Sequence, residues 1–255
     1  MAELAAHRPE YCRGLDRKNM LKVELHSHTA DDPLDRIAHS TTDLIDRAAA
    51  LGYDALAITL HDRQLDITHL VPYAADRGIV LIPGIARTVQ GRHVLLLNFR
   101  GGTGGGTEAV QTFEDVRRLK RDGARLIVAP HPFFPSRKCL LGAMNRHADL
   151  FDAVECNGMF TSTMNFNKAA ERWAARHGKP MVGNGDVHCL EQLGSTYSLV
   201  DAPKNADAIC HAVAAGRVTV VSQPHTWPTA IRIMARIVLP HLAGHRRDVP
   251  SPAYY

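Results

Sequence analysis

The sequence predicts an α/β fold, organised as one closed or nearly closed, largely parallel barrel. Short apolar runs alternate with amphipathic segments along most of the 255 residues, the pattern expected of repeated strand–helix units. We find no internal repeat and no Pro/Ser-rich linker, and the length suits a single α/β barrel. In such barrels, functional side chains gather at the carboxyl ends of the strands.

The order of elements follows from the periodicity of apolar residues. The predicted strands are 21–28, 54–62, 79–85, 93–99, 124–132, 151–158, 179–188 and 218–222. The predicted helices are 40–53, 70–78, 112–123, 165–178 and 205–217. The runs 79–85 and 93–99 are expected to pair as a hairpin across 86–92. The glycine-rich segment 100–108 predicts a flexible loop, because no Gly-Lys-Ser/Thr follows it to form a phosphate-binding loop.

The barrel domain is expected to span residues 20–226. An N-terminal extension (1–19) precedes it, and a C-terminal helix and tail (227–255) follow it. The amphipathic segment 229–242 predicts a helix, and the polar segment 244–255 predicts a disordered end.

Composition excludes several classes of protein. The net charge is only +4 with histidine neutral, so charge alone does not favour a nucleic-acid partner. The five cysteines form no CxxC pair, and we expect reduced thiols in a cytoplasmic protein. The charged N-terminus lacks the apolar core of a signal peptide, and no run reaches the ~20 apolar residues of a membrane span.

Histidines and aspartates follow most of the predicted strands. They are His26 and His28, His61, His93 at the start of the hairpin strand, His131, and Asp186 with His188. In the extended pairs HxH and DxH, side chains at i and i+2 point to the same side. One histidine at a strand end is usually structural, but the same residue type at five strand ends predicts a shared site.

Imidazole and carboxylate ligands suit zinc, manganese or iron. The number of candidate ligands exceeds what one ion needs, so we expect two or three divalent metals. Clustered metals generate hydroxide at neutral pH and stabilise the attacking and leaving oxygens of a phosphoryl group.

The motifs "ELHSHT", "ALAITLHD", "PGIARTVQGRHVLLL", "APHP" and "GNGDVH" resemble, in order and spacing, those of the PHP (polymerase and histidinol phosphatase) family. The resemblance covers roughly residues 22–222. It implies a distorted (β/α)7 TIM-like barrel in a single domain, a trinuclear metal centre and hydrolysis of phosphoesters.

Carried over by position, the resemblance divides the ligands among three metals. His26, His28 and Asp186 would hold one metal, and His93 and His131 a second. His61 and His188 would hold the third, together with a residue of the loop after the first strand. That loop differs from the usual pattern, and Asp32 is the preferred ligand, ahead of Asp31, Asp35 and His39. His61, His188 and Asp62, which could orient a bound water, are the candidate catalytic residues.

Two further positions depart from the family pattern. Leu60 stands where the family has an aspartate before the histidine, which removes a partner that would orient a ligand. Ala86 stands where a glutamate normally bridges two metals, so we expect weaker metal binding or fewer than three ions. Three interpretations stay open for Ala86: an engineered inactivating change, a natural divergence with a rearranged centre, or a natural pseudoenzyme.

The predicted function is hydrolysis of a small phosphorylated metabolite or nucleotide. Arg63 and Arg137 follow candidate ligands closely and are expected to contact phosphate, and Asn157 is expected to line the pocket. The alternatives are a ligand-binding pseudoenzyme with a partial metal site and a nuclease of the same family. An amidohydrolase-type site is disfavoured, because no strand-end lysine is placed to bridge metals. We expect no nucleic-acid or membrane partner, and the sequence leaves the oligomeric state open.

Overall fold

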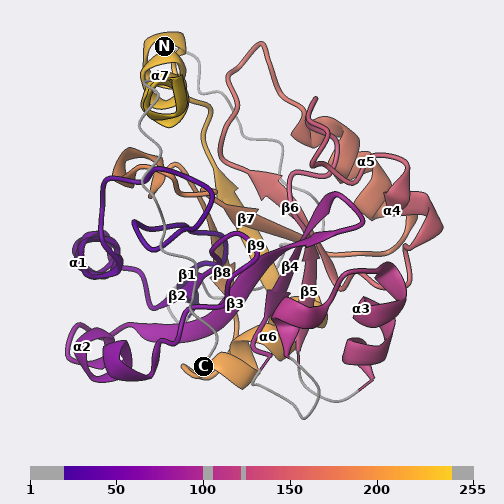
Figure 1. Cartoon of the computed structure of the whole chain (residues 1–255), viewed down its shortest axis with the longest axis horizontal. Coiled ribbons are helices and arrows are strands. Elements are labelled where there is room, and N and C mark those ends of the chain that lie inside the picture. The colour runs from indigo at the N-terminus through magenta and orange to yellow at the C-terminus, as the bar shows by residue number, and fades with distance from the viewer. Residues whose placement is uncertain (1–19, 100–105, 122–124, 243–255) are drawn as a thin grey trace, which may run out of the picture.

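The computed structural model describes residues 20–99, 106–121 and 125–242. In this part of the chain the strands form one nine-stranded sheet in the order β7-β6-β5-β4-β3-β2-β1-β8-β9 (Figure 1). The strands are β1 (Leu21–Glu24), β2 (Ala55–Ile58), β3 (Val80–Val89), β4 (Arg92–Leu97), β5 (Leu126–Ala129), β6 (Ala153–Asn157), β7 (Met181–Asn184), β8 (Thr196–Val200) and β9 (Val218–Ser222).

The sheet is largely parallel and curls towards closure. β1, β2 and β3 pair in parallel, as do β5, β6 and β7, whereas β4 and β8 run antiparallel to their neighbours. At the seam, β7 packs against β8 and β9, and the Ser198 hydroxyl bonds to both the N–H and the carbonyl of Gly183. A Cβ on Gly183 would lie 2.8 Å from the carbonyl oxygen of Tyr197, so only glycine allows this close approach. The predicted distorted TIM-like barrel is confirmed.

The helices before β9 connect strands around the outside of this sheet, and the last helix follows β9 (Figure 1). They are α1 (Thr41–Ala50), α2 (Val71–Ala75), α3 (Phe113–Lys120), α4 (Ala143–Arg146), α5 (Asn167–Arg176), α6 (Ala206–Ala214) and α7 (Trp227–Leu242). Short 3-10 turns lie at Thr68–Leu70, Thr107–Ala109 and Leu190–Gln192. Ser40 and Thr112 begin α1 and α3 with reciprocal capping boxes, each of which satisfies backbone N–H groups that the helix leaves free.

The core follows the two-residue alternation of the strands. Along β3, Ile82 and Ala86 belong to the apolar cluster that also contains Leu95 of β4. Ile85 and Val89 belong to a different cluster, formed with α3 and α5. The side chain of Ala86 is therefore packed among apolar residues, and the residue is fully buried.

The structure corrects two details of the predicted topology. The hairpin turn is only Gln90–Gly91, with φ of 47° and 78°, so 86–89 are strand residues paired with β4; two residues with positive φ fit the type I′ turn favoured between antiparallel strands. β8 was missed, because its short sequence "TYSLV" gave no apolar run.

Three predicted segments extend beyond what the structure describes: the N-terminal extension, most of the glycine-rich loop and the polar C-terminal end. The predicted C-terminal helix is present as α7. Among the described residues, no helix combines the length and the apolar character needed to span a bilayer.

Candidate metal centre

The two motifs with paired ligands, "HSH" and "DVH", lie side by side. Their middle residues, Ser27 and Val187, form a parallel bridge. The N–H of His28 donates to the carbonyl of Val187 (2.9 Å), and the N–H of Val187 donates to the carbonyl of His26 (3.1 Å). Since alternate side chains of extended backbone share a face, this pairing brings two imidazoles of one motif beside the carboxylate and imidazole of the other.

The remaining ligand candidates come from neighbouring strand ends. His61 follows β2 and bridges Ala86 of β3, while His93 lies on β4 opposite Thr88. His131, which follows β5, and Asp186, which follows β7, have φ values of 28° and 53°. Non-glycine residues adopt this left-handed region at an energetic cost, and such residues concentrate at functional sites.

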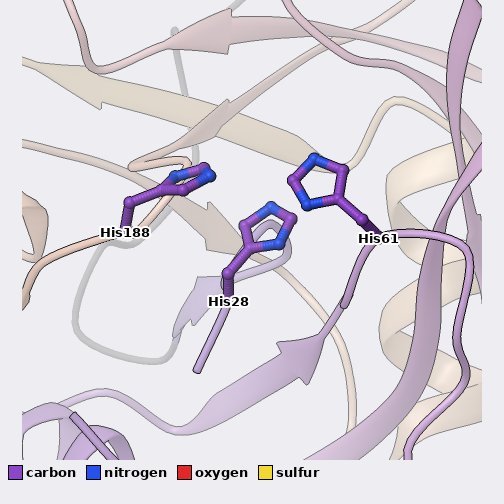
Figure 2. Close-up of side chains that lie close together, drawn as sticks. All are labelled: His28, His61 and His188. Atoms are coloured by element: carbon purple, nitrogen blue, oxygen red, sulfur yellow. The ribbon is translucent and has the colours of Figure 1, made fainter. Parts of the chain in front are cut away.

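The six histidines form one continuous group. The ring of His28 lies 4.3 Å from those of both His61 and His188, measured between ring centroids, and Figure 2 shows these three side chains converging. His26 extends the group at 5.2 Å from His28. His131 lies 5.7 Å from His26 and 6.1 Å from His93, which in turn lies 4.9 Å from His61.

In five of these rings the Nδ1 atom has a partner. His28 and His61 each bond Asp32 through Nδ1, at 2.9 and 3.0 Å. The other partners are Glu155 for His26 (2.8 Å), the backbone carbonyl of Asp186 for His188 (2.9 Å) and the sulfur of Cys139 for His131 (3.2 Å). Metal-ligating histidines characteristically use one ring nitrogen this way, which fixes the ring and leaves the other nitrogen for the metal.

Asp32 is the main orienting carboxylate. Its Oδ2 accepts from the two imidazoles and from the N–H of His61 (2.9 Å), and its Oδ1 accepts from the N–H groups of Leu34 and Asp35 (both 2.9 Å). Although burial alone would raise its pKa, hydrogen bonds from His28 and His61 hold the pKa of Asp32 well below its usual value. Asp32 is therefore ionised and has its acceptor capacity filled by the chain.

A second buried carboxylate, Glu155 of β6, supports the opposite end of the group. Its Oε1 accepts from His26 and from the side-chain amide of Asn184 (2.9 Å), and its Oε2 accepts from the N–H of His131 (2.7 Å). Burial opposes a charge on His26, but Asp186 and Glu155 raise its pKa to about 9. Metal binding at Nε2 of His26 would thus displace a proton.

Within this group of histidines, two buried ring nitrogens have no hydrogen-bond partner among the described residues: Nε2 of His28 and Nε2 of His93. Outside the group, Nδ1 of His147, whose ring stacks on Phe113, is a third. Burial, reinforced by neighbouring histidines, lowers the pKa of His28 to about 4 and that of His93 to about 2, so both rings are neutral at pH 7. An unsatisfied buried polar atom is costly. A metal ion would accept the free lone pair of each ring, so the residues present fit the metals that the sequence predicts.

Four groups of side chains bring ligand atoms within 4.8 Å of one another. They are His28–His61–His188, His26–His28–Asp186, His26–His131–Glu155 and Asp32–Asp35–His61. Asp186 is central, with Oδ1 at 3.2 Å from Nε2 of His26 and 3.6 Å from Nε2 of His28. Several histidine and aspartate clusters here can therefore bind metal ions.

A cavity of about 310 Å³ opens beside these groups. Five of the predicted metal ligands line it: His61, His93, His131, Asp186 and His188. The lining also includes Leu34, Asp35, Ser136 and Lys138. Cavities of this size accommodate small molecules.

Four residues predicted for catalysis or substrate binding do not line this cavity. The carboxylate of Asp62 accepts from Arg87 (2.8 Å) and from the N–H of Thr88. Arg63 is exposed and bonds the carbonyl of Asp31 (3.3 Å), and Arg137 is exposed as well.

Asn157, the fourth of these, is buried and donates to Oδ2 of Asp186 at 3.0 Å. It orients a candidate ligand in this arrangement.

Sequence reasoning missed several supporting residues. Glu155 had a recognisable signal, a carboxylate in the middle of the apolar strand "AVECN". Gln192 had none: its amide holds the Asp186–Cys189 turn by accepting from the N–H groups of His188 and Cys189 and donating to the carbonyl of Asp186. Asp35 ranked behind Asp32 in the sequence analysis, yet it lines the cavity with its Oδ2 3.0 Å from Nε2 of His188.

Fold and site together define the class: a nearly closed α/β barrel with a histidine- and aspartate-rich candidate metal centre at its strand ends. Residues 165–218 match a family model described as PHP-associated. The resemblance predicted from the motifs is confirmed, since the chain carries a PHP-associated segment and shares its fold with a protein described as containing a predicted PHP-like metal-dependent phosphoesterase.

Solved structures with this fold include a two-domain protein from Bacteroides vulgatus that contains a predicted PHP-like metal-dependent phosphoesterase (TM-score 0.61, 18% identity, covering 86% of this chain and 70% of that chain). PsfC from Pseudomonas syringae matches with a TM-score of 0.61 and 17% identity over 89% of this chain and 100% of its own. The lesion-specific endonuclease Q of Pyrococcus furiosus matches with a TM-score of 0.51 and 14% identity, over 84% of this chain and 66% of its own. No curated protein matches the sequence.

Proposed function

We propose that the protein is a metal-dependent phosphoesterase that hydrolyses a small phosphorylated metabolite or nucleotide. The observation that carries this proposal is the cavity lined by five candidate ligands, beside two buried imidazole nitrogens that lack a partner in the described chain. A site built only for stability would pair those nitrogens with protein groups.

The candidate ligands divide into sets according to their positions. His26, His28 and Asp186 form one set, and their ligand atoms lie within 4.8 Å of one another. His93 and His131 face the cavity from β4 and the end of β5. We assign two or three ions of zinc, manganese or iron to these positions, because imidazole and carboxylate donors suit those metals.

For the set that contains His61 and His188, we assign Asp35 as the carboxylate ligand. Its Oδ2 lies 3.0 Å from Nε2 of His188 and 3.4 Å from Nδ1 of His61. Its side chain lines the cavity and is 24% exposed. Asp32 has a fully buried side chain and five hydrogen bonds from the chain, so it orients His28 and His61 and has little capacity left for a cation.

Metals bound at these residues would activate water for attack on phosphorus and offset the charge that develops on the phosphoryl and leaving oxygens. The chain itself provides rigidity. Glu155, Asp32 and the turn held by Gln192 fix the ring orientations before a substrate arrives, so little reorganisation is needed at the moment of reaction.

The test is hydrolysis by metal-reconstituted protein. Chelator-treated protein would be loaded with Zn²⁺, Mn²⁺ or Fe²⁺ under anaerobic conditions, its metal content measured by mass spectrometry, and its activity assayed on phosphorylated metabolites, nucleotides, cyclic phosphates and oligonucleotides. We expect metal-dependent hydrolysis of a small monoester, absent in His28→Ala. Matched circular dichroism spectra of the two proteins would exclude unfolding.

The same panel separates the alternatives. Tight metal and phosphate binding without turnover, in both the chain with Ala86 and the Ala86→Glu variant, would indicate a ligand-binding pseudoenzyme and contradict the proposal. Hydrolysis confined to oligonucleotides, with an affinity that falls steeply with salt, would indicate a nuclease.

A further inference from the structure

The cavity contains one basic side chain besides its histidines. Lys138 lines it, and no other lysine or arginine of the described residues does. Ser136 lies two residues earlier on the same loop and also faces the cavity. Both residues belong to the segment that follows β5, directly after the candidate ligand His131.

The backbone of this segment is held firmly. The carbonyl of Lys138 accepts from the N–H of His93 (2.8 Å), and the guanidinium of Arg92 donates to the carbonyls of Arg137 (2.7 Å) and Cys139 (2.8 Å). Lys138 is thereby anchored to β4 through both of its neighbours and through its own carbonyl, so the origin of its side chain is fixed relative to His93.

The charge of Lys138 is available to a ligand. In contrast, Arg87, near the carboxyl end of β3, forms an ion pair with Asp62. In the described part of the chain, the ammonium group of Lys138 has no ion pair or hydrogen bond. Because its side chain lines the cavity together with His93 and His131, its positive charge lies on that side of the cavity.

Negative charge is also distributed unequally between the two sides of the cavity. Three carboxylates, those of Asp32, Asp35 and Asp186, contact the rings of His28, His61 and His188. On the other side, Glu155 lies within 4.8 Å of His131, and position 86, beside His61, presents a buried methyl group. With metals bound, the side that contains His93, His131 and Lys138 would carry the less compensated positive charge. An anion with more than one charge is favoured there.

Resting on the function proposed above, we propose that Lys138, assisted by the Ser136 hydroxyl, binds a non-bridging phosphate oxygen and makes the site selective for phosphomonoesters over phosphodiesters. A monoester dianion has three unesterified oxygens, so one remains to accept a hydrogen bond from Lys138 when the other two bind the metals. A diester has one oxygen fewer, a single charge, and a second ester group that would have to occupy the rim where Lys138 lies.

The experiment compares two esters with the same leaving group, p-nitrophenyl phosphate and bis(p-nitrophenyl) phosphate. In Lys138→Ala, we expect kcat/KM for the monoester to fall about 10- to 100-fold, mainly through KM, as for the loss of a charge-assisted hydrogen bond. For the diester we expect a fall of less than about 3-fold, since that bond is not made. Lys138→Arg should keep most of the selectivity because it keeps the charge.

Lys168→Ala is the matched control, because Lys168 is exposed on α5 and lies outside the cavity lining. Equal losses for both esters in Lys138→Ala, or no loss for either, would overturn the inference. So would an equal monoester loss in Arg137→Ala, which would assign the phosphate contact to the arginine that sequence reasoning favours. Unchanged circular dichroism and metal content would show that the variants fold.

A second measurement separates this inference from the proposed function. Inorganic phosphate would be titrated into the metal-reconstituted protein by calorimetry. If neither ester is hydrolysed, the proposed function fails, yet a phosphate affinity about 10-fold weaker in Lys138→Ala and unchanged in Lys168→Ala would still support Lys138 as the phosphate contact. Equal phosphate affinities in all three proteins would refute that contact whether or not hydrolysis occurs.

Discussion

The two sides of the cavity hold their histidines in different ways. On the aspartate side, defined by Asp32, Asp35 and Asp186, the imidazoles of His28, His61 and His188 contact carboxylates. On the lysine side, defined by His93, His131, Cys139 and Lys138, the partner of His131 is a thiol. Nε2 of His93, like Nε2 of His28 on the aspartate side, has no hydrogen-bond partner in the described chain.

This difference sets an order of metal affinity. Carboxylates offset the charge of a cation and increase the basicity of the rings they contact, whereas a neutral thiol does neither to the same degree. On the lysine side, Glu155 accepts from the backbone N–H of His131 and lies within 4.8 Å of a ring nitrogen of His131, and position 86 contributes no charge. The lysine side therefore has one carboxylate where the aspartate side has three. We therefore expect the aspartate side to bind metal more tightly than the lysine side.

The largest effect is expected from removing charge on the aspartate side. Asp35→Asn should lower the bound metal by about one ion per chain, with a loss of activity on the order of 100-fold, because a direct ligand is lost. Asp32→Asn should keep the ion count at saturating metal but weaken metal affinity about 10- to 100-fold, as expected for a residue that orients ligands. Metal titration followed by mass spectrometry would measure both.

Asp76→Asn, an exposed substitution at the end of α2, is the control for loss of a negative charge as such. If Asp32→Asn lost the ion while Asp35→Asn retained it, the two roles would be reversed and Asp32 would be the ligand, as the sequence alone suggested.

Ala86→Glu should reduce the difference between the two sides. The added carboxylate would compensate charge beside His93 and His131, and we expect about 10-fold tighter binding of the weakest ion, with a similar gain in hydrolysis. Without metal, a larger side chain at this fully buried position should lower the stability by about 1–3 kcal/mol through overpacking. Calorimetry with and without metal would measure both effects.

Ala86→Gln provides the uncharged control for the same change in volume. It should be destabilised to a similar degree but gain neither metal affinity nor activity. Equal behaviour of the glutamate and glutamine variants would show that the centre does not require a carboxylate at position 86. Other residues of the site would then compensate for its absence.

The unequal sides also show which parts of the site were accessible from the sequence. His26, His28, Asp186 and His188 were predictable because each pair alternates along one extended segment, and the barrel brings strand ends together. Their close pairing through Ser27 and Val187 joins segments that are far apart in the sequence and depends on the closure of the barrel. The barrel itself followed from the alternation of strands and helices.

Residues placed by tertiary contacts or by local backbone reversal were not predictable. Asp62 adjoins His61, but its φ of 53° directs the carboxylate to Arg87 and Thr88 instead of the cavity. Cys139 and Lys138 reach the site because Arg92 anchors their loop to β4, a contact between segments more than forty residues apart. No sequence pattern predicts such a contact.

Substitution of Cys139 is expected to have the smallest effect, and it tests the lysine side specifically. Its sulfur lies 3.2 Å from Nδ1 of His131, and burial raises the pKa of the thiol to about 11, so at neutral pH it is a weak, uncharged partner. Cys139→Ala should therefore weaken metal binding by less than about 10-fold, below the effect of Asp32→Asn, because a weak bond orients the ring less firmly. Cys139→Ser should restore most of the affinity through its hydroxyl.

The comparison of these two variants separates orientation from packing. Both remove the sulfur, but only serine keeps a group that can bond Nδ1, so a loss of stability shared by both reflects the cavity left in the core. Titration of Zn²⁺ in the Ala86→Glu background would report on the lysine side directly. A Cys139→Ala effect as large as that of Asp32→Asn would mean that the thiol holds His131 as firmly as a carboxylate, and the two sides would then differ in charge alone.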